Sequence, residues 1–253
     1  MRYIEFTIHD KIASIQLNKP EKLNALDHDL LNELSDCLTQ LEENESLKAL
    51  FITGNTQAFC AGGDLNYMSK MNQDDAKEAS AWIQHIFNQI EALPFFTIAI
   101  VEGIAFGGGL ELALACDMRI ANENAQFALP EMRYGIIPAG GGTRRFQEHT
   151  GYANCMYTMS ANKILTANDA LNQGIIQELV SSEDMPAFLD KYKQKISSYT
   201  NESIYEVKAL IKSAMSKSRQ QAFSDEAELF GKLMEREGSK KIQSFFESKQ
   251  NKQ

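Results

Sequence analysis

The chain has 253 residues, 43% of them apolar and 23% charged, and its formal net charge at pH 7 is −9. A chain of this length and composition can bury a sizeable core and is typical of a folded globular protein. The acidic balance argues against a nucleic-acid partner, because nucleic-acid-binding proteins present a basic surface to the phosphates.

The cysteines and the N-terminus indicate the compartment. Cys37, Cys60, Cys116 and Cys155 are widely spaced and form no CxxC pair. We therefore expect no metal site and no disulfide framework. The first residues contain no apolar signal-peptide core, and no run approaches the roughly 20 apolar residues of a membrane span. The sequence predicts a cytoplasmic protein without a membrane segment.

The first elements follow from apolar patterning. Alternation predicts paired strands at residues 3–9 and 12–17, followed by a loop at 18–22. A helix should come next, with Asp27 as a plausible N-cap and a short apolar strand at 49–53 behind it. The apolar face of this helix comprises Leu30, Leu31, Leu34, Cys37, Leu38 and Leu41.

A polar stretch and an amphipathic helix are expected next. Residues 66–75 predict a loop or a frayed helix, and apolar residues then recur at helical spacing over 82–93. We expect Trp82 to belong to the core. The flexible thioethers of Met68 and Met71 suit either gaps in the core or an adaptable apolar pocket, and both alternatives stay open.

Two glycine turns follow strand-like segments. Residues 58–65 read Ala-Phe-Cys-Ala-Gly-Gly-Asp-Leu. Residues 106–111 read Phe-Gly-Gly-Gly-Leu-Glu, after a predicted buried strand at 95–101 and before a predicted helix at 110–116. Glycine lets the backbone approach a ligand closely, and the first N–H groups of a helix lack intrahelical partners. The second turn therefore offers backbone donors to an oxygen anion.

Glu111 lies three residues after Gly108, about one helical turn on, so its side chain can return to the same face. Backbone donors beside a carboxylate form a catalytic arrangement. The alternative is a simple glycine turn followed by a solvated glutamate, and this motif taken alone favours that alternative.

Short elements continue the chain. Strands are expected at 118–121 and 125–128. The glycine-rich segment 135–145 lacks the GK[ST] ending of a phosphate-binding loop, and a helix is expected to begin at Thr143. Two further helices and a strand are predicted at residues 153–160, 167–173 and 175–180.

From residue 185 the pattern is helical throughout. The shift from strand–helix alternation to continuous helix predicts a core with the active site at residues 1–195 and a C-terminal helical region at 196–253. Apolar stripes mark that region: Ile204, Val207, Leu210 and Ile211, then Phe223, Ala227, Phe230 and Leu233.

Four segments in register resemble the crotonase (enoyl-CoA hydratase/isomerase) superfamily. They are residues 18–26 (Asn-Lys-Pro-Glu-Lys-Leu-Asn-Ala-Leu), the two glycine turns, and residues 125–131 followed by Gly-Gly-Gly-Thr at 140–143. The resemblance runs from about residue 11 to residue 180 and is weaker in the helical tail. Each motif alone is moderately specific, whereas the four in order are highly specific.

The resemblance implies an α/β fold, a crotonase-like spiral of ββα repeats with a C-terminal α-helical trimerisation region. It also implies homotrimers, often as dimers of trimers, and an acyl-coenzyme A thioester as substrate. No separate cofactor is implied, because coenzyme A is part of the substrate.

The match places an oxyanion hole at the backbone N–H groups of Gly63 and Gly108. Glu111 and Glu131 fall on both acid/base positions of enoyl-CoA hydratases. By this resemblance Glu111 orients and activates water, and Glu131 exchanges a proton with Cα while sharing the positioning of the water. Taken alone, Glu131 would be interpreted as a helix-start glutamate after Pro130.

The match also implies contacts with the acyl-CoA substrate. Two of these residues, in the tail, would reach the coenzyme from a neighbouring region or subunit. Lys22 is equally consistent with a solvated loop lysine. The implied contact residues are Lys22, Leu23, Ala25, Ala61, Gly62, Asp64, Leu65, Phe246 and Lys249.

The predicted activity is that of an enoyl-CoA hydratase, which adds water across the 2,3 double bond of a trans-2-enoyl-CoA to give a 3-hydroxyacyl-CoA. The alternatives are an enoyl-CoA isomerase, which can use one glutamate, and a hydratase or dehydratase acting on a carrier-protein-bound substrate. An RNA-binding homologue is disfavoured by 34 acidic against 25 basic residues. We interpret Cys60 as a packing residue, and Asp117 and Arg119 as a polar brace.

Overall fold

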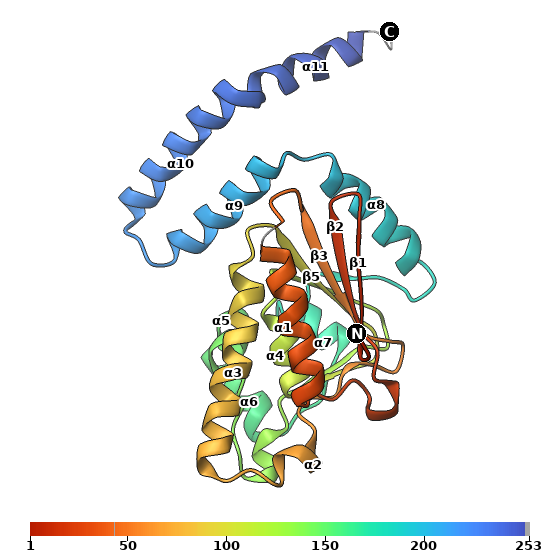
Figure 1. Cartoon of the computed structure of the whole chain (residues 1–253). Coiled ribbons are helices and arrows are strands. Elements are labelled where there is room, and N and C mark those ends of the chain that lie inside the picture. Colours follow the sequence, from red (N-terminus) through yellow and green to blue (C-terminus); the bar gives the residue numbers. More distant parts are fainter. Residues whose placement is uncertain (43, 251–253) are drawn as a thin grey trace. The chain divides into compact units, whose positions relative to one another are not determined.

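The computed structural model describes residues 1–42 and 44–250, shown as a ribbon in Figure 1. It divides into two compact units, Met1–Ser198 and Tyr199–Gln253. The expected boundary after residue 195 falls inside helix α8 (Met185–Ser197). No helix in the described part of the chain is both long and apolar enough to cross a bilayer.

A six-stranded sheet forms one layer of the first unit. Its strands lie in the order β1-β2-β3-β5-β7-β10. The first pair is an antiparallel hairpin and the remaining pairs are parallel. The strands are β1 (Ile4–His9), β2 (Ile12–Leu17), β3 (Ala49–Thr53), β5 (Phe96–Val101), β7 (Met118–Ala121) and β10 (Glu178–Leu179).

The central strands of this sheet are almost continuously apolar. Strand β3 reads Ala-Leu-Phe-Ile-Thr and β5 reads Phe-Thr-Ile-Ala-Ile-Val, with nearly all of these side chains buried. Such runs are typical of parallel strands that are covered on both faces. Helix α1 (His28–Glu42) packs its predicted apolar face, Leu30 to Leu41, into the core and also contacts α3 (Gln73–Ala92).

A second, four-stranded sheet has the order β4-β6-β8-β9. Strands β4, β6 and β8 are parallel neighbours, and β9 is antiparallel to β8. The strands are β4 (Ala58–Cys60), β6 (Ile104–Phe106), β8 (Gln126–Ala128) and β9 (Leu165–Thr166).

The remaining helices of the first unit are mostly short. They are η1 (Pro20–Lys22), α2 (Leu65–Met68), α4 (Gly108–Leu114), η2 (Glu131–Tyr134), α5 (Gly142–Thr150), α6 (Tyr152–Ser160) and α7 (Ala167–Asn172).

Two predicted segments differ from the structure. Residues 66–75 are not a single loop or frayed helix, because α2 ends at Met68 and α3 begins at Gln73, capped by Asn72. The strand predicted at 175–180 is limited to Glu178–Leu179. The N–H groups of Ile175 and Ile176 both donate to the Ala170 carbonyl, so these residues continue the turn after α7.

Asp117 and Arg119 form the expected polar brace. The Asp117 carboxylate accepts the Thr97 N–H at 2.8 Å, and the Thr97 hydroxyl accepts the Asp117 N–H at 2.9 Å. Buried Arg119 donates to the carbonyls of Ile175 at 2.6 Å and Cys116 at 2.7 Å. The brace ties β5 and β7 to the end of α4 and to the turn after α7.

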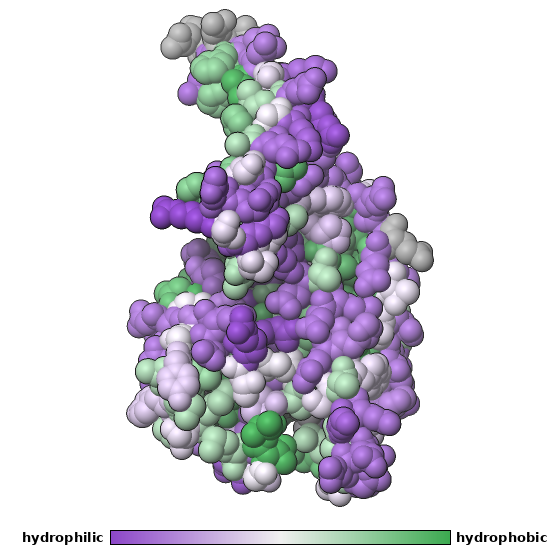
Figure 2. All heavy atoms as spheres, turned by 90° about the vertical axis from the view of Figure 1, so that its left-hand side faces the viewer, coloured by the Kyte–Doolittle hydropathy of each residue, from purple (hydrophilic) through white to green (hydrophobic). Residues whose placement is uncertain are grey.

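The described part of the second unit, residues 199–250, is mainly helical. It comprises α9 (Asn201–Ala214), α10 (Arg219–Leu233), the π-helical turn η3 (Met234–Gly238) and α11 (Ser239–Gln250). Its helices expose large apolar side chains, and green apolar patches interrupt the polar surface in Figure 2. The exposed side chains include Val207, Ile211, Met215, Phe223, Phe230, Ile242, Phe245 and Phe246.

Candidate active site

Three functional segments meet because three parallel strands end at the same edge of the four-stranded sheet. Strand β4 leads into the turn Ala61-Gly62-Gly63, β6 into Gly107-Gly108, and β8 into the segment that carries Glu131. The carboxyl ends of parallel neighbours lie side by side. Segments that are far apart in the sequence therefore converge on one point.

The two glycine turns face each other closely. Gly62 has φ +100°, and a Cβ there would lie 2.7 Å from the Phe106 carbonyl oxygen. A Cβ on Gly108 would lie only 3.7 Å from the backbone nitrogen of Gly63. Substitution at Gly62 would therefore disturb the contact between the turns.

The N–H groups of Gly63 and Gly108 are free to bind an acceptor. The bonds Leu26 N–H to Gly62 O (2.7 Å) and Asp64 N–H to Leu26 O (2.9 Å) hold the chain on either side of Gly63. Gly108 is the first residue of α4, so its N–H has no intrahelical partner. Across the described residues neither N–H group donates to a protein acceptor.

Glu111 projects from the first turn of α4 and is only 2% exposed. Its Oε1 accepts the N–H groups of Gly140 at 2.8 Å and Gly142 at 2.6 Å. Burial raises the pKa of this carboxyl, while the two N–H groups and the Arg145 charge oppose the rise. The carboxylate is therefore rigidly oriented, with one oxygen anchored by backbone donors.

Glu131 lies at the start of η2 and is half-buried. Burial, with a further contribution from the Glu111 charge, raises the pKa of Glu131 to about 7. Its Oε2 is buried and has no hydrogen-bond partner among the described residues. A carboxyl with a pKa near neutrality and an unoccupied oxygen is suited to proton exchange with a bound molecule.

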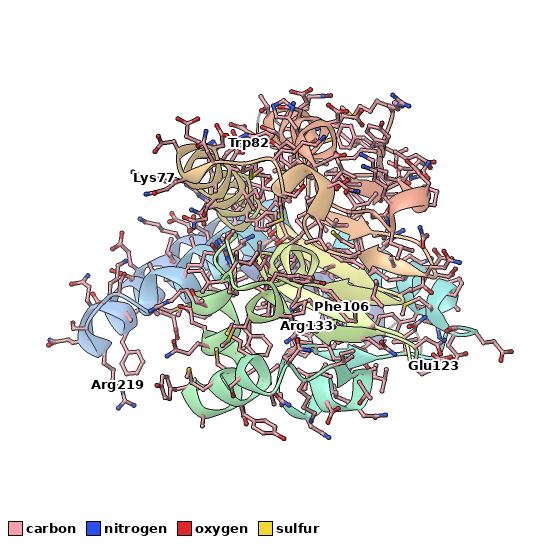
Figure 3. All side chains as sticks on the ribbon, turned by 90° about the horizontal axis from the view of Figure 1, so that it is seen from below. Lys77, Trp82, Phe106, Glu123, Arg133 and Arg219 are labelled. Carbon is pink, nitrogen blue, oxygen red and sulfur yellow. The ribbon has the colours of Figure 1, made fainter. Side chains whose placement is uncertain are left out.

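Glu111, Glu131, Gly63 and Gly108 line one cavity of about 790 Å³. Most of the remaining wall is apolar and comes from α2, α3 and the segment after Glu131. In Figure 3 the labelled side chains Trp82, Phe106 and Arg133 come from α3, β6 and η2. The apolar part of the wall includes Leu26, Met68, Met71, Trp82, Ile83, Tyr134, Ile136, Ile137 and Pro138.

The cavity wall corrects one expectation and decides another. Trp82 is not a core residue, because it lines the cavity, and its ring packs against His28 with a centroid separation of 5.3 Å. Met68 and Met71 also line the cavity, which favours the pocket alternative. Helical spacing identified the apolar face of α3 but not the empty space in front of part of it.

Sequence reasoning missed the wall formed by residues 133–138. The available signal was position: this segment connects Glu131 to Gly140, whose N–H group binds Glu111. A connection that short keeps its side chains close to both carboxylates.

Several predicted coenzyme-contact residues lie together beside the first glycine turn. Lys22 donates to the Asp64 carboxylate, and the Ala61 N–H donates to the Leu23 carbonyl at 2.9 Å. The hydrogen bond from Lys22 is the main cause of a lowered pKa at Asp64. Asp64 also caps α2, and Leu65 lines the cavity.

Ala25 belongs to the same segment, because its N–H donates to the Lys22 carbonyl at 3.0 Å. Phe246 and Lys249 belong to α11 of the second unit. Cys60 accepts the Gly62 N–H at 3.4 Å, and burial raises the pKa of its thiol to about 12, as suits a packing residue. No cluster of three or more potential metal-ligating side chains occurs within the described chain.

Residues 7–253 match the family model described as Enoyl-CoA hydratase/isomerase. The protein belongs to this family. The predicted resemblance to the crotonase superfamily is thereby confirmed.

Related proteins and structures agree with this assignment. A crotonyl-CoA hydratase of Syntrophomonas wolfei is 34% identical over 223 residues, 88% of this chain and 86% of that protein. A short-chain-enoyl-CoA hydratase of Clostridium acetobutylicum is 30% identical over 237 residues, 93% and 91% of the two chains. The crystal structure of an enoyl-CoA hydratase from Bacillus anthracis superposes with a TM-score of 0.91 at 29% identity, covering 97% and 96%. The crotonase fold predicted from sequence is confirmed.

The raised pKa of Glu131 predicts a pH dependence of stability. The folded protein holds this proton up to about pH 7, whereas the unfolded chain releases it near the ordinary value of 4.5. The free energy of unfolding should therefore fall as the pH rises between these values. In Glu131→Gln part of this fall should disappear, as measured by urea denaturation at about pH 5 and about pH 8.

Glu123→Gln is the control for this measurement. The pKa of exposed Glu123 is lowered by its hydrogen bonds, so its carboxyl is mostly ionised in both states at the two pH values of the measurement. It should leave the fall between the two pH values unchanged. An identical fall in Glu131→Gln and the wild type would contradict the raised pKa.

Proposed function

We propose that this protein is an enoyl-CoA hydratase, which adds water across the 2,3 double bond of a trans-2-enoyl-CoA to give a 3-hydroxyacyl-CoA. One observation carries the proposal: two carboxyls with raised pKa values, Glu111 and Glu131, line the same cavity as the unpaired N–H groups of Gly63 and Gly108. The hydratase names of the related proteins support the same activity.

The two backbone N–H groups are suited to hold the thioester oxygen. Water attack at Cβ moves an electron pair onto this oxygen and produces an enolate. Gly63 and Gly108 would stabilise the developing negative charge without reorganisation, because their turns are fixed before the substrate arrives. Loss of such a donor typically lowers turnover by about two to three powers of ten.

The two carboxyls divide the proton transfers. One oxygen of Glu111 is anchored by Gly140 and Gly142, and its other oxygen would accept a proton from the attacking water. Hydroxide then bonds to Cβ, and Glu131 supplies the proton that bonds to Cα. Glu111 then holds the proton taken from the water and Glu131 has lost its own, so one proton must pass from Glu111 to Glu131 before the next turnover.

The coenzyme part of the substrate would lie along the first glycine turn. We assign its contacts to two segments and, from a neighbouring region or subunit, to two tail residues. The residues are Lys22, Leu23, Ala25, Ala61, Gly62, Asp64 and Leu65, with Phe246 and Lys249 from the tail. Lys22 and Asp64 already form an ion pair there, which fixes the lysine beside the turn. The reaction requires neither a metal nor a redox cofactor. The two carboxyls and the water exchange every proton, and the thioester oxygen accepts the electron pair that moves during attack.

Hydration should be detectable with the purified protein. Incubation with 2-enoyl-CoA thioesters should remove the absorbance of the conjugated double bond, and a chelator or an added nicotinamide should not change the rate. Substrates of increasing chain length would define how much of the 790 Å³ cavity the acyl chain uses. Isomerisation of 3-enoyl-CoA with no reaction of 2-enoyl-CoA would establish the isomerase alternative instead.

Removal of either ionisable carboxyl should lower turnover. Glu111→Gln and Glu131→Gln keep the size and polarity of the side chain, and each should reduce kcat by about two to four powers of ten. The losses should not add in the double variant, because both residues act on one transition state. Deuterium exchange at Cα of a bound saturated acyl-CoA should depend more on Glu131.

The exposed residue Glu178 provides the control, and Glu178→Gln should turn over like the wild type. Near-normal hydration by Glu131→Gln would refute the two-carboxyl mechanism and favour a one-glutamate reaction.

We also propose that the protein forms homotrimers, alone or as dimers of trimers. The second unit exposes Ile211 at 66% and Phe230 at 67%, and a helical region with this much apolar surface is typically covered by association. Sedimentation at micromolar concentration should show a trimer or hexamer. Ile211→Asp should weaken the association of the subunits. Ser216→Asp, at an exposed polar position just beyond the same helix, is the control and should leave the association unchanged. A wild-type protein that sediments as a monomer would contradict the proposal.

A further inference from the structure

Arg145 of α5 carries a buried charge that the reaction described above does not use. It is only 7% exposed. Its guanidinium donates to the Gly140 carbonyl at 2.7 Å, to Asn88 Oδ1 at 2.5 Å and to Glu91 Oε2 at 3.0 Å. Burial of a guanidinium is unfavourable unless its donors are satisfied. Nη1 and Nη2 have these acceptors, whereas Nε has no hydrogen-bond partner among the described residues.

Gly140 joins this guanidinium to Glu111. Its carbonyl accepts from Arg145, and its own N–H donates to Glu111 Oε1. Two residues later, Gly142 donates the second N–H to the same oxygen. A shift of the Gly140 carbonyl would therefore move at least one of the two donors that orient the carboxylate.

The position of residues 140–142 between Arg145 and Glu111 explains why all three are glycines. A Cβ on Gly140 would lie 2.6 Å from the Phe87 ring, and a Cβ on Gly142 would lie 2.8 Å from Glu111 Oε1. Gly141 has φ +98°, and a Cβ there would lie 2.4 Å from the Arg145 guanidinium. The loop passes between the carboxylate and the guanidinium with no room for a side chain.

Helix α3 anchors the same loop from the other side. Ser80 Oγ and Gln84 Nε2 donate to the Ala139 carbonyl at 2.8 and 2.9 Å. Asn88 and Glu91, further along α3, hold Arg145. Consecutive carbonyls of the loop are thus fixed to one long helix, directly at Ala139 and through Arg145 at Gly140.

We propose that Arg145 is a positioning residue for hydration: it fixes the Gly140 carbonyl so that the N–H groups of Gly140 and Gly142 hold one oxygen of Glu111 and leave the other directed at water. This inference rests on the proposed function. Arg145 acts through the loop and does not contact the substrate.

The charge of Arg145 has a second effect on Glu111. The charged groups that face Glu111 are Arg145 from α5 and Glu131 from η2, and Glu91 of α3 pairs with the guanidinium. Arg145 lowers the pKa of Glu111 against the effect of burial. Without this charge, Glu111 takes up its proton at a higher pH and loses the ionised form that activates water.

The test compares Arg145→Gln with Arg144→Gln. Both remove one positive charge from α5, but Arg144 is 78% exposed and forms an ion pair with Glu148 on the same helix. Arg145→Gln should lower kcat by roughly tenfold to a hundredfold, as expected for a misplaced reacting group, with KM changed by no more than about threefold. Its acid limb of kcat against pH should move to higher pH, whereas Arg144→Gln should match the wild type.

Glu91→Gln provides an independent test at a position that is 42% exposed. It keeps Arg145 but removes the negative charge beside it, so the acid limb should move slightly to lower pH, opposite to Arg145→Gln. If Arg145→Gln fails to fold, the pH dependence of Glu91→Gln tests the effect of Arg145 on Glu111 instead. A folded Arg145→Gln with wild-type kcat and acid limb, or an unmoved acid limb in Glu91→Gln, overturns the inference.

Wild-type hydration in the same assay tests the proposed function separately. A wild type that hydrates 2-enoyl-CoA while Arg145→Gln behaves identically leaves the function intact and removes only the role of Arg145.

Discussion

Burial of the Glu111 carboxylate is the constraint on which the arrangement of this site depends. An ionised carboxylate away from water is stable only when hydrogen bonds replace its hydration. Here one oxygen receives two N–H groups from residues 140–142, where α5 also begins and contributes the positive end of its dipole. The glycines of the loop, the guanidinium of Arg145 and the anchoring face of α3 all follow from the need to present those donors.

The small parallel sheet supplies the other half of the site. Strands β4, β6 and β8 are only three residues each, yet their shared direction brings two glycine turns and Glu131 to one edge. The turns can approach because Gly62 and Gly107 adopt positive φ values that other residues rarely take. Two backbone N–H groups then face the cavity from elements that are not neighbours in sequence.

The two carboxyls differ because their surroundings differ. Glu111 is anchored by backbone donors and lies near a positive charge, whereas Glu131 has a buried oxygen without a partner and lies near a negative one. Burial raises the pKa of both carboxyls, and their neighbours differ in charge and hydrogen bonding. Pairs of carboxyls in unlike surroundings are typical of sites where one acts as base and the other as acid.

Local pattern in the sequence was enough to predict most strands and helices, because apolar periodicity and glycine turns depend on neighbouring residues. The crotonase fold was implied by the resemblance of four motifs in register to that superfamily. Local pattern could not decide that Trp82 and residues 133–138 face a cavity, since periodicity marks an apolar face and not what lies opposite it. It also gave no sign that Arg145 holds Gly140, because that contact depends on how α5 packs on α3. Only the tertiary structure decided those features. It determines which distant segments enclose the same buried space, and which buried charges, such as Arg145 and Glu111, lie close together there.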